Sequence, residues 1–185
     1  MLRGIGTYVL AAVAVAILAL LGVMAFMRRD HKVELVVTYP KSAPAAVWRL
    51  LTNHAAEPDW LPAFATVGRQ ADIAGQEVWT HTSLDQRFSF TVRTIAAIPE
   101  QRYERLLLRD NQARNQSWDG RWVYELQPQQ GGTLLKVTEY GWTDGLPFFI
   151  TQRVIANPDA FLKYYAEMIG RQLNDPPTIQ VVRSH

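Results

Sequence analysis

The sequence predicts an α+β domain in which seven antiparallel strands pack with a long C-terminal helix, preceded by one transmembrane helix. Between residues 66 and 142 apolar and polar residues alternate, which is the period of a half-buried strand. The apolar residues of 158–173 recur at helical spacing, and a long apolar run near the N-terminus indicates a membrane-spanning helix. The expected boundaries are an anchor at 1–29, a domain at 30–175 and a tail at 176–185.

The N-terminal apolar run carries the prediction of an anchor. No charged side chain occurs in Gly4–Met27, and at ~1.5 Å per residue such a helix crosses the ~30 Å hydrocarbon layer. A cleaved signal peptide is the alternative, although its apolar stretch is usually shorter. We therefore expect a single-pass protein of a bacterial inner membrane that contacts the bilayer through residues 5–27. More basic residues follow the run than precede it, which favours a cytoplasmic soluble domain.

Composition argues against several functional classes. The chain of 185 residues has a formal charge of +2 and no cysteine, and its arginines are scattered along the sequence. A weak, dispersed charge argues against a nucleic-acid partner. The lack of cysteine excludes disulfides, thiolate catalysis and cysteine-bound metals. Because 48% of the residues are hydrophobic, the domain can bury a sizeable core.

Proline, glycine and changes of period divide the domain into its elements. The expected strands span 33–39, 66–72, 76–83, 87–97, 102–109, 117–126 and 133–142. A helix is expected after Ser42 and Pro44, a short turn at 57–61 and the long helix at 158–173. The tail that follows Pro176 and Pro177 is expected to be loose.

This order of elements resembles the START-like superfamily, in its polyketide cyclase/dehydrase-type (SRPBCC) branch with the helix-grip fold. The matching segments are VELVVTYPKSAPAAVWRLLTN, PDWLP, GGTLLKVTEYG and the aromatic-rich terminal helix. The resemblance covers about residues 32–174. It implies a curved antiparallel sheet wrapped around the C-terminal helix, with an apolar cavity between them. Members of the superfamily bind lipids, sterols, quinones or polyketides, and a minority catalyse cyclisation or dehydration.

Aromatic side chains are the main candidates for a ligand pocket. An apolar ligand needs a concave aromatic lining with few polar groups, although aromatic side chains dominate ordinary cores as well. In the fold that the resemblance implies, the inward set consists of Phe88, Phe90, Trp122, Tyr124 and Tyr165.

Glu139 is an acidic residue at an inward position. It shares the parity of Leu135 and Val137, so its side chain is expected on the inner face of the sheet. A buried carboxylate is costly unless it is paired, and Arg93 or Arg105 could supply the partner. The pair is interpreted either as a structural ion pair or as a polar anchor for a ligand headgroup. Arg105 and Glu139 are therefore included among the predicted ligand-binding residues.

Histidines do not form a recognisable site in the sequence. His54, Glu57 and Asp59 lie close together but lack the i, i+4 histidine pair of a helical zinc site, so they are interpreted as polar helix-end residues and caps. His81 is expected in a strand with no carboxylate in register. No nucleophile, base and orienting group can be assembled. No catalytic residue, metal or cofactor is therefore predicted.

These observations favour a membrane-anchored, non-catalytic binding protein for a hydrophobic small molecule, lipid or quinone-like. One alternative is an enzyme of the aromatase/cyclase type, with Glu139 or His81 as general acid or base. Another is a non-catalytic interaction subunit of a membrane complex. The sequence does not identify the ligand or a protein partner.

Overall fold

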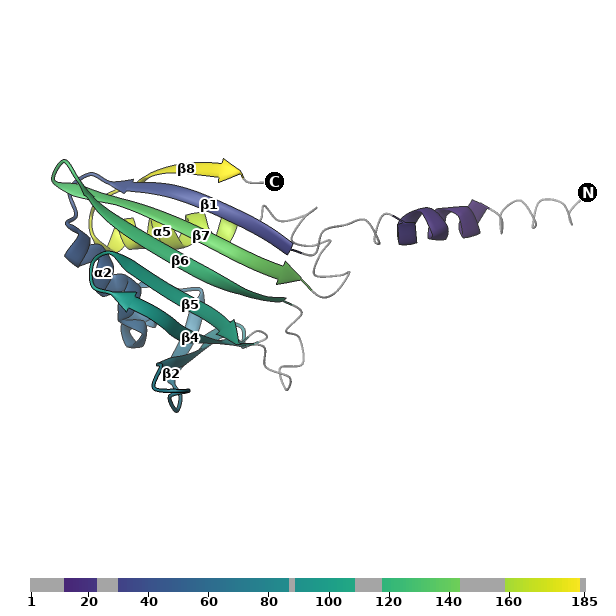
Figure 1. Ribbon diagram of the computed structural model, residues 1–185, viewed down its shortest axis with the longest axis horizontal. Coiled ribbons are helices and arrows are strands. Elements are labelled where there is room, and N and C mark those ends of the chain that lie inside the picture. The colour runs from purple at the N-terminus through teal and green to yellow at the C-terminus, as the bar shows by residue number, and fades with distance from the viewer. Residues whose placement is uncertain (1–11, 23–29, 87–88, 109–117, 144–158, 184–185) are drawn as a thin grey trace, which may run out of the picture.

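The computed structural model describes residues 12–22, 30–86, 89–108, 118–143 and 159–183. Its strands are β1 (Asp30–Tyr39), β2 (Phe64–Arg69), β3 (Val78–Ser83), β4 (Ser89–Ile98), β5 (Arg102–Leu108), β6 (Trp118–Gln129), β7 (Gly132–Thr143) and β8 (Thr178–Arg183). The helices that follow β1 in the chain are α2 (Pro44–Thr52), the 3-10 helix η1 (His54–Ala56), α3 (Glu57–Trp60) and α5 (Ala160–Gln172). Figure 1 shows a curved sheet with α2 and α5 on one side of it.

The predicted antiparallel meander is confirmed. The sheet has the order β2-β3-β4-β5-β6-β7-β1-β8, so strands β2 to β7 each lie beside their neighbour in the chain. The turn between β6 and β7 shows the local cause of one hairpin. Gln130 and Gly131 both have positive φ, 42° and 86°, which is the two-residue turn whose twist matches the flanking strands.

The sheet has eight strands, and the prediction of seven is wrong. The additional strand is β8, which occupies the segment that was expected to be a loose tail. It pairs antiparallel with β1, from Val33 opposite Arg183 to Thr38 opposite Thr178. Without β8, β1 would be the edge strand, and its outward backbone N–H and C=O groups would be unpaired. Pairing with β1 therefore gives this C-terminal segment its order.

The prediction of a single-pass membrane protein is wrong. Residues 12–22 are helical, which at ~1.5 Å per residue gives about 16 Å, half of the ~30 Å hydrocarbon layer. Within the described part of the chain, no helix combines the length and the apolar character that a membrane crossing requires. The remainder of the predicted anchor, at 1–11 and 23–29, lies outside the described residues.

Helix α5 covers the inner face of the sheet, and the helix predicted at 158–173 is observed at Ala160–Gln172. Its buried face includes Leu162, Tyr165 and Ile169, at the expected helical spacing. The Tyr39 hydroxyl donates a hydrogen bond of 2.9 Å to the carbonyl oxygen of Ala166, which joins β1 to the helix. The phenol ring of Tyr165 is thereby held over the interior of the sheet.

Candidate functional site

The candidate site is built around a short turn between α2 and β2. Helix α2 ends at Thr52, because the next residue, Asn53, has a non-helical φ of −90° and ψ of 72°. Residues His54–Ala56 then form a single 3-10 turn that leads into α3 at Glu57. In 3-10 geometry the side chains at i and i+3 eclipse one another. His54 and Glu57 are therefore brought face to face by the local backbone.

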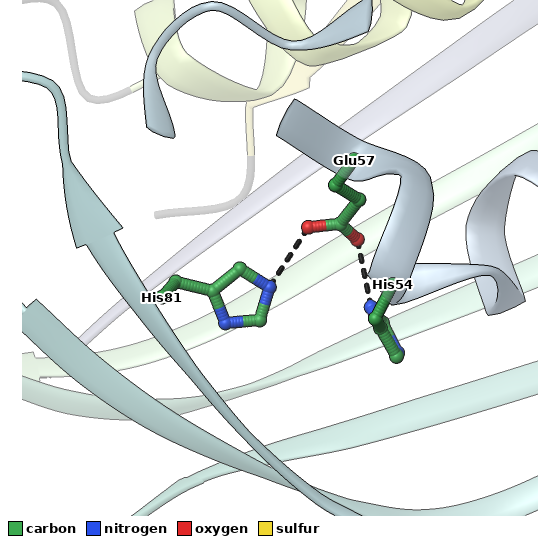
Figure 2. Close-up of side chains that lie close together, drawn as sticks. All are labelled: His54, Glu57 and His81. Atoms are coloured by element: carbon green, nitrogen blue, oxygen red, sulfur yellow. Dashed lines mark hydrogen bonds and ion pairs between the residues drawn. The ribbon is translucent and has the colours of Figure 1, made fainter. Parts of the chain in front are cut away.

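Glu57 is the centre of a buried polar cluster that joins η1, α3, β3 and β5; Figure 2 shows its two histidines. His54 Nδ1 lies 2.7 Å from Glu57 Oε1, and His81 Nε2, from β3, lies 2.8 Å from Oε2. Arg105 Nη1, from β5, lies 3.5 Å from Oε1. The exposed fractions of His54, Glu57 and His81 are 1%, 0% and 1%. A carboxylate at this depth is stable only because several donors surround it.

The cluster keeps the Glu57 carboxylate ionised. Burial alone would raise its pKa, but the hydrogen bonds from His54 and His81 and the charge of Arg105 hold the pKa well below its ordinary value. The pKa of His54 is lowered, first by burial and then by the charge of Arg105, against the opposing effect of Glu57. The negative charge of Glu57 is therefore opposed by the positive charge of Arg105, while His54 is neutral.

The hydrogen bonds to Glu57 and Tyr103 together fix the tautomer of His54. Burial raises the pKa of the Tyr103 phenol to about 12, so the hydroxyl keeps its proton at neutral pH. Its oxygen lies 2.5 Å from His54 Nε2 and 3.1 Å from Thr94 Oγ1. Because Glu57 only accepts hydrogen bonds, the proton of neutral His54 sits on Nδ1, and Nε2 accepts from Tyr103. The ring orientation of His54 is thus fixed on both sides.

The Arg105 guanidinium sits inside a cage of aromatic rings. Its central carbon lies 5.9 Å, 5.5 Å, 5.2 Å and 5.8 Å from the ring centroids of Tyr103, Trp122, Tyr124 and Tyr165. The guanidinium also donates a short hydrogen bond to the Tyr124 hydroxyl. Cation–π contacts of this kind offset part of the cost of burying the charge.

Four of the predicted aromatic residues lie in one buried core cluster, namely Phe90, Trp122, Tyr124 and Tyr165. The centroid distance between the Phe90 and Trp122 rings is 6.0 Å, and that between Tyr124 and Tyr165 is 6.3 Å. Phe88 lies outside the described residues. The structure therefore brings these rings together with Arg105, while their role in ligand binding stays a prediction.

Glu139 points inward, as its parity predicts. Its Oε2 accepts a 3.0 Å hydrogen bond from Trp122 Nε1, and its Oε1 lies 3.0 Å from His31 Nε2. The expectation of Arg93 or Arg105 as its partner is wrong, because Arg105 pairs with Glu57. The side chain of Glu139 is 15% exposed and that of His31 is 6% exposed. Glu139 thus belongs to a second histidine–carboxylate group, separate from the Glu57 cluster.

His54 and Glu57 begin η1 and α3, so they are helix-end residues as interpreted, but no side-chain cap hydrogen bond forms at either helix and both residues are buried. No carboxylate lies in register with His81, as expected, yet Glu57 contacts its Nε2 from α3. The sequence contains one signal that could have found the first pair, which is the i, i+3 spacing in a segment too short for an α-helix. It contains none for the second pair. His81 reaches Glu57 from another element, and no cross-strand partner supplies the carboxylate.

A pocket of about 570 Å³ lies at the C-terminal end of α5. Its lining includes Glu167, Arg171, Asn174 and Pro177. This position differs from that of the predicted apolar cavity, which was expected between the sheet and the helix around the aromatic cluster. The predicted interior cavity stays a prediction.

No family model and no curated protein matches the sequence. Solved structures do match it. A START superfamily protein from Mycobacterium smegmatis has a TM-score of 0.61 at 14% identity, covering 78% of this chain and 97% of its own. Ara h 8.0201 has a TM-score of 0.58 at 18% identity, covering 79% and 99%. The Zhui aromatase/cyclase from Streptomyces sp. R1128 has a TM-score of 0.51 at 14% identity, covering 78% and 87%.

These structural neighbours belong to the START/SRPBCC superfamily, and the curved antiparallel sheet with its C-terminal helix is consistent with the helix-grip fold. At such low identity the likeness describes the fold, not the chemistry of the site. The class of ligand has to be argued from the side chains of this chain.

Proposed function

We propose that this domain binds a hydrophobic small molecule between the curved sheet and α5, and that the ligand carries an oxygen that accepts hydrogen bonds. One observation supports this most directly. Trp60 Nε1, Arg105 Nε and the Tyr165 hydroxyl are buried and have no hydrogen-bond partner among the described residues. Unpartnered buried donors are costly to a fold. A ligand oxygen that accepts from them offsets that cost.

The three donors belong to one neighbourhood. The Trp60 and Tyr165 rings lie 5.6 Å apart, and the Arg105 guanidinium carbon lies 5.8 Å from the Tyr165 ring. Around them are the apolar faces of Phe90, Trp122 and other core rings. Aromatic walls with a few hydrogen-bond donors suit a flat apolar molecule with a carbonyl group. A quinone-like ligand has this chemistry, and so does a lipid with an ester or acid group.

Ligand entry requires the packed rings to separate. The centroids of the neighbouring rings lie 5.6 to 6.4 Å apart, so the side chains that would line the site touch one another. A ligand would replace these contacts with its own apolar surface, at little net cost in buried area. The hydrogen bonds to its oxygen then supply specificity.

A cavity-filling substitution tests the proposal. Val92 is 1% exposed on the inner face of β4, and Thr91 lies next to it on the opposite face. An environment-sensitive apolar dye should bind the wild type with roughly micromolar affinity, which corresponds to ~8 kcal/mol. Val92→Phe should weaken dye binding at least tenfold because it fills the interior, and Thr91→Phe should leave it unchanged.

Both variants are first compared with the wild type by circular dichroism, since overpacking can cost ~1–3 kcal/mol of stability. Native mass spectrometry of the purified protein provides an independent measurement. A co-purifying apolar species supports the proposal. Equal dye binding by the two folded variants would show that the interior is not the binding site.

A second candidate function, acid–base catalysis on the bound ligand, is favoured by the position of His81. Its Nε2 bonds to Glu57 Oε2, while Nδ1 is buried without a partner among the described residues. A carboxylate that holds one imidazole nitrogen and leaves the other free is a common arrangement for a general base. The neighbouring Zhui aromatase/cyclase is an enzyme by its name. Conversion of a co-purified ligand that is lost in His81→Gln would favour this candidate over simple binding.

A further inference from the structure

The cluster around Glu57 contains the donor atoms of a metal site. His54 Nδ1, a carboxylate oxygen of Glu57 and His81 Nε2 all lie within 4.8 Å of one another. Figure 2 shows the carboxylate between the two imidazole rings, with one oxygen directed at each. Two histidine nitrogens and one carboxylate oxygen are a common ligand set for zinc in proteins. Among the described residues this is the one group of three or more His, Asp or Glu side chains whose atoms could hold a metal ion.

We propose that His54, Glu57 and His81 bind one divalent transition-metal ion of the zinc class. Two imidazole nitrogens and one carboxylate favour this class over Mg²⁺ and Ca²⁺, which prefer all-oxygen ligand sets. The proposal does not depend on ligand binding between the sheet and α5. A protein could hold the metal and bind no apolar molecule, or the reverse.

The ligand atoms need to move only a short distance. Nitrogens bound to one ion at ~2.0–2.1 Å lie ~3.4 Å apart in tetrahedral geometry. From a separation of at most 4.8 Å, the required contraction is roughly an ångström. Glu57 is the first residue of the four-residue helix α3, and rotation of its side chain would make room for the ion between the two rings.

One of the two histidines already has an outer partner that suits metal binding. When Nδ1 of His54 coordinates the ion, its proton moves to Nε2, and no net proton is lost from the ring. Nε2–H then donates to the Tyr103 hydroxyl, which lies 2.5 Å away. The Tyr103 hydroxyl in turn donates to Thr94 Oγ1, 3.1 Å away. Outer hydrogen bonds of this kind orient metal-bound histidines and strengthen their binding.

Arg105 opposes the ion and provides a second test. Its Nη1 lies 3.5 Å from Glu57 Oε1, so a cation on the carboxylate is repelled by the guanidinium. The metal affinity of the wild type is therefore reduced by Arg105. The competing explanation is a polar network that stabilises the fold and binds no metal. Under that explanation no substitution in the cluster should create or remove a metal site.

The experiment measures binding of Co²⁺ and Zn²⁺ to the full-length protein after treatment with a chelator. Co²⁺ should bind at one equivalent, produce the intense visible absorption of a four-coordinate site, and be displaced by Zn²⁺. Elemental analysis should give one zinc per chain. A wild type that binds neither ion at one equivalent in the micromolar range overturns the proposal.

The variants separate a metal site from a structural network. His54→Asn places an amide N–H near the position of Nδ1, and His81→Gln places one near Nε2, so each can keep the hydrogen bond to Glu57. Each should weaken metal affinity by roughly 100-fold or more, because an amide is a poor zinc ligand. Folding is checked by circular dichroism. If either folded variant binds as tightly as the wild type, the assigned ligands are wrong.

His31→Gln is the matched control, because its amide N–H lies near the position of His31 Nε2. His31 bonds to the carboxylate of Glu139 at 3.0 Å, yet no second histidine accompanies that pair in any metal-compatible group among the described residues. Metal affinity should be unchanged in this variant. Arg105→Met should tighten Co²⁺ binding about tenfold, because it removes the repelling charge. A loss of binding in His31→Gln, or weaker binding in Arg105→Met, would contradict the assignment.

Discussion

The two histidine–carboxylate groups of this domain are built from the same residue types but in different surroundings. Glu57 is fully buried and contacts His54, His81 and Arg105. Glu139 is 15% exposed and contacts His31 and the Trp122 indole. The first group includes a permanent positive charge, and within the described part of the chain the second has none in contact. Replacement of the carboxylate should therefore destabilise the fold far more at Glu57 than at Glu139.

The largest expected effect is the difference between Glu57→Gln and Glu139→Gln in the unfolding free energy that each variant loses. Glu57→Gln leaves Arg105 buried without its counter-charge, which should cost ~3–5 kcal/mol. Glu139→Gln retains an acceptor for Trp122 and leaves no arginine unpaired, so ~1 kcal/mol or less is expected. Urea denaturation of both variants measures the difference. Equal losses would mean that the charge of Arg105 does not distinguish the two groups.

A smaller effect is expected from removal of the hydroxyl that supports His54. Tyr103→Phe keeps the ring beside Trp48 and Arg105 but leaves His54 Nε2 without a donor. An unsatisfied buried acceptor should cost ~1–2 kcal/mol. Tyr140→Phe, at a residue that is 40% exposed, is the control and should change the unfolding free energy by less than ~0.5 kcal/mol. If Tyr140→Phe loses as much unfolding free energy as Tyr103→Phe, the loss comes from removing any tyrosine hydroxyl and not from the contact with His54.

The smallest expected effect is the change of the unfolding free energy with pH near neutrality. The pKa of His54 is lowered in the folded state, so its contribution is complete above the unfolded value near 6.5 and is lost as pH falls below it. The pKa of Glu57 is also lowered, and its contribution is lost at more acidic pH, below about 4.5. Both groups should therefore lower the stability of the fold as the pH falls.

One group changes the unfolding free energy by at most ~1.4 kcal/mol per pH unit, so less than ~1 kcal/mol should be lost between pH 7 and 6. Thermal unfolding of chelator-treated protein from pH 7.5 to 4 measures this dependence. His54→Asn should remove the part of the loss above pH 5 and keep the part at lower pH. An increase in wild-type stability between pH 7 and 5 would contradict the lowered pKa of His54, and an increase in either protein below pH 4.5 would contradict that of Glu57.

Local patterns predicted much of the fold and one part of the candidate site. Alternation predicted the meander, and helical spacing predicted α5 and the inward position of Tyr165. Parity predicted that Glu139 points inward. The single-pass prediction failed, because a long apolar run is a necessary but insufficient condition for a spanning helix. The count of seven strands failed because β8 pairs with β1, its distant neighbour in the sequence.

The sequence by itself determined which residues alternate, where α2 and α5 lie, and which side chains of each strand share a face. These properties depend on neighbours a few positions apart and on fixed backbone periods. Only the tertiary structure decided that Glu57 meets His81 and Arg105, which lie 24 and 48 positions further along the chain. Their meeting depends on how the sheet curves beneath α3. Sheet curvature arises from pairing and packing over the whole domain, so no short pattern encodes it.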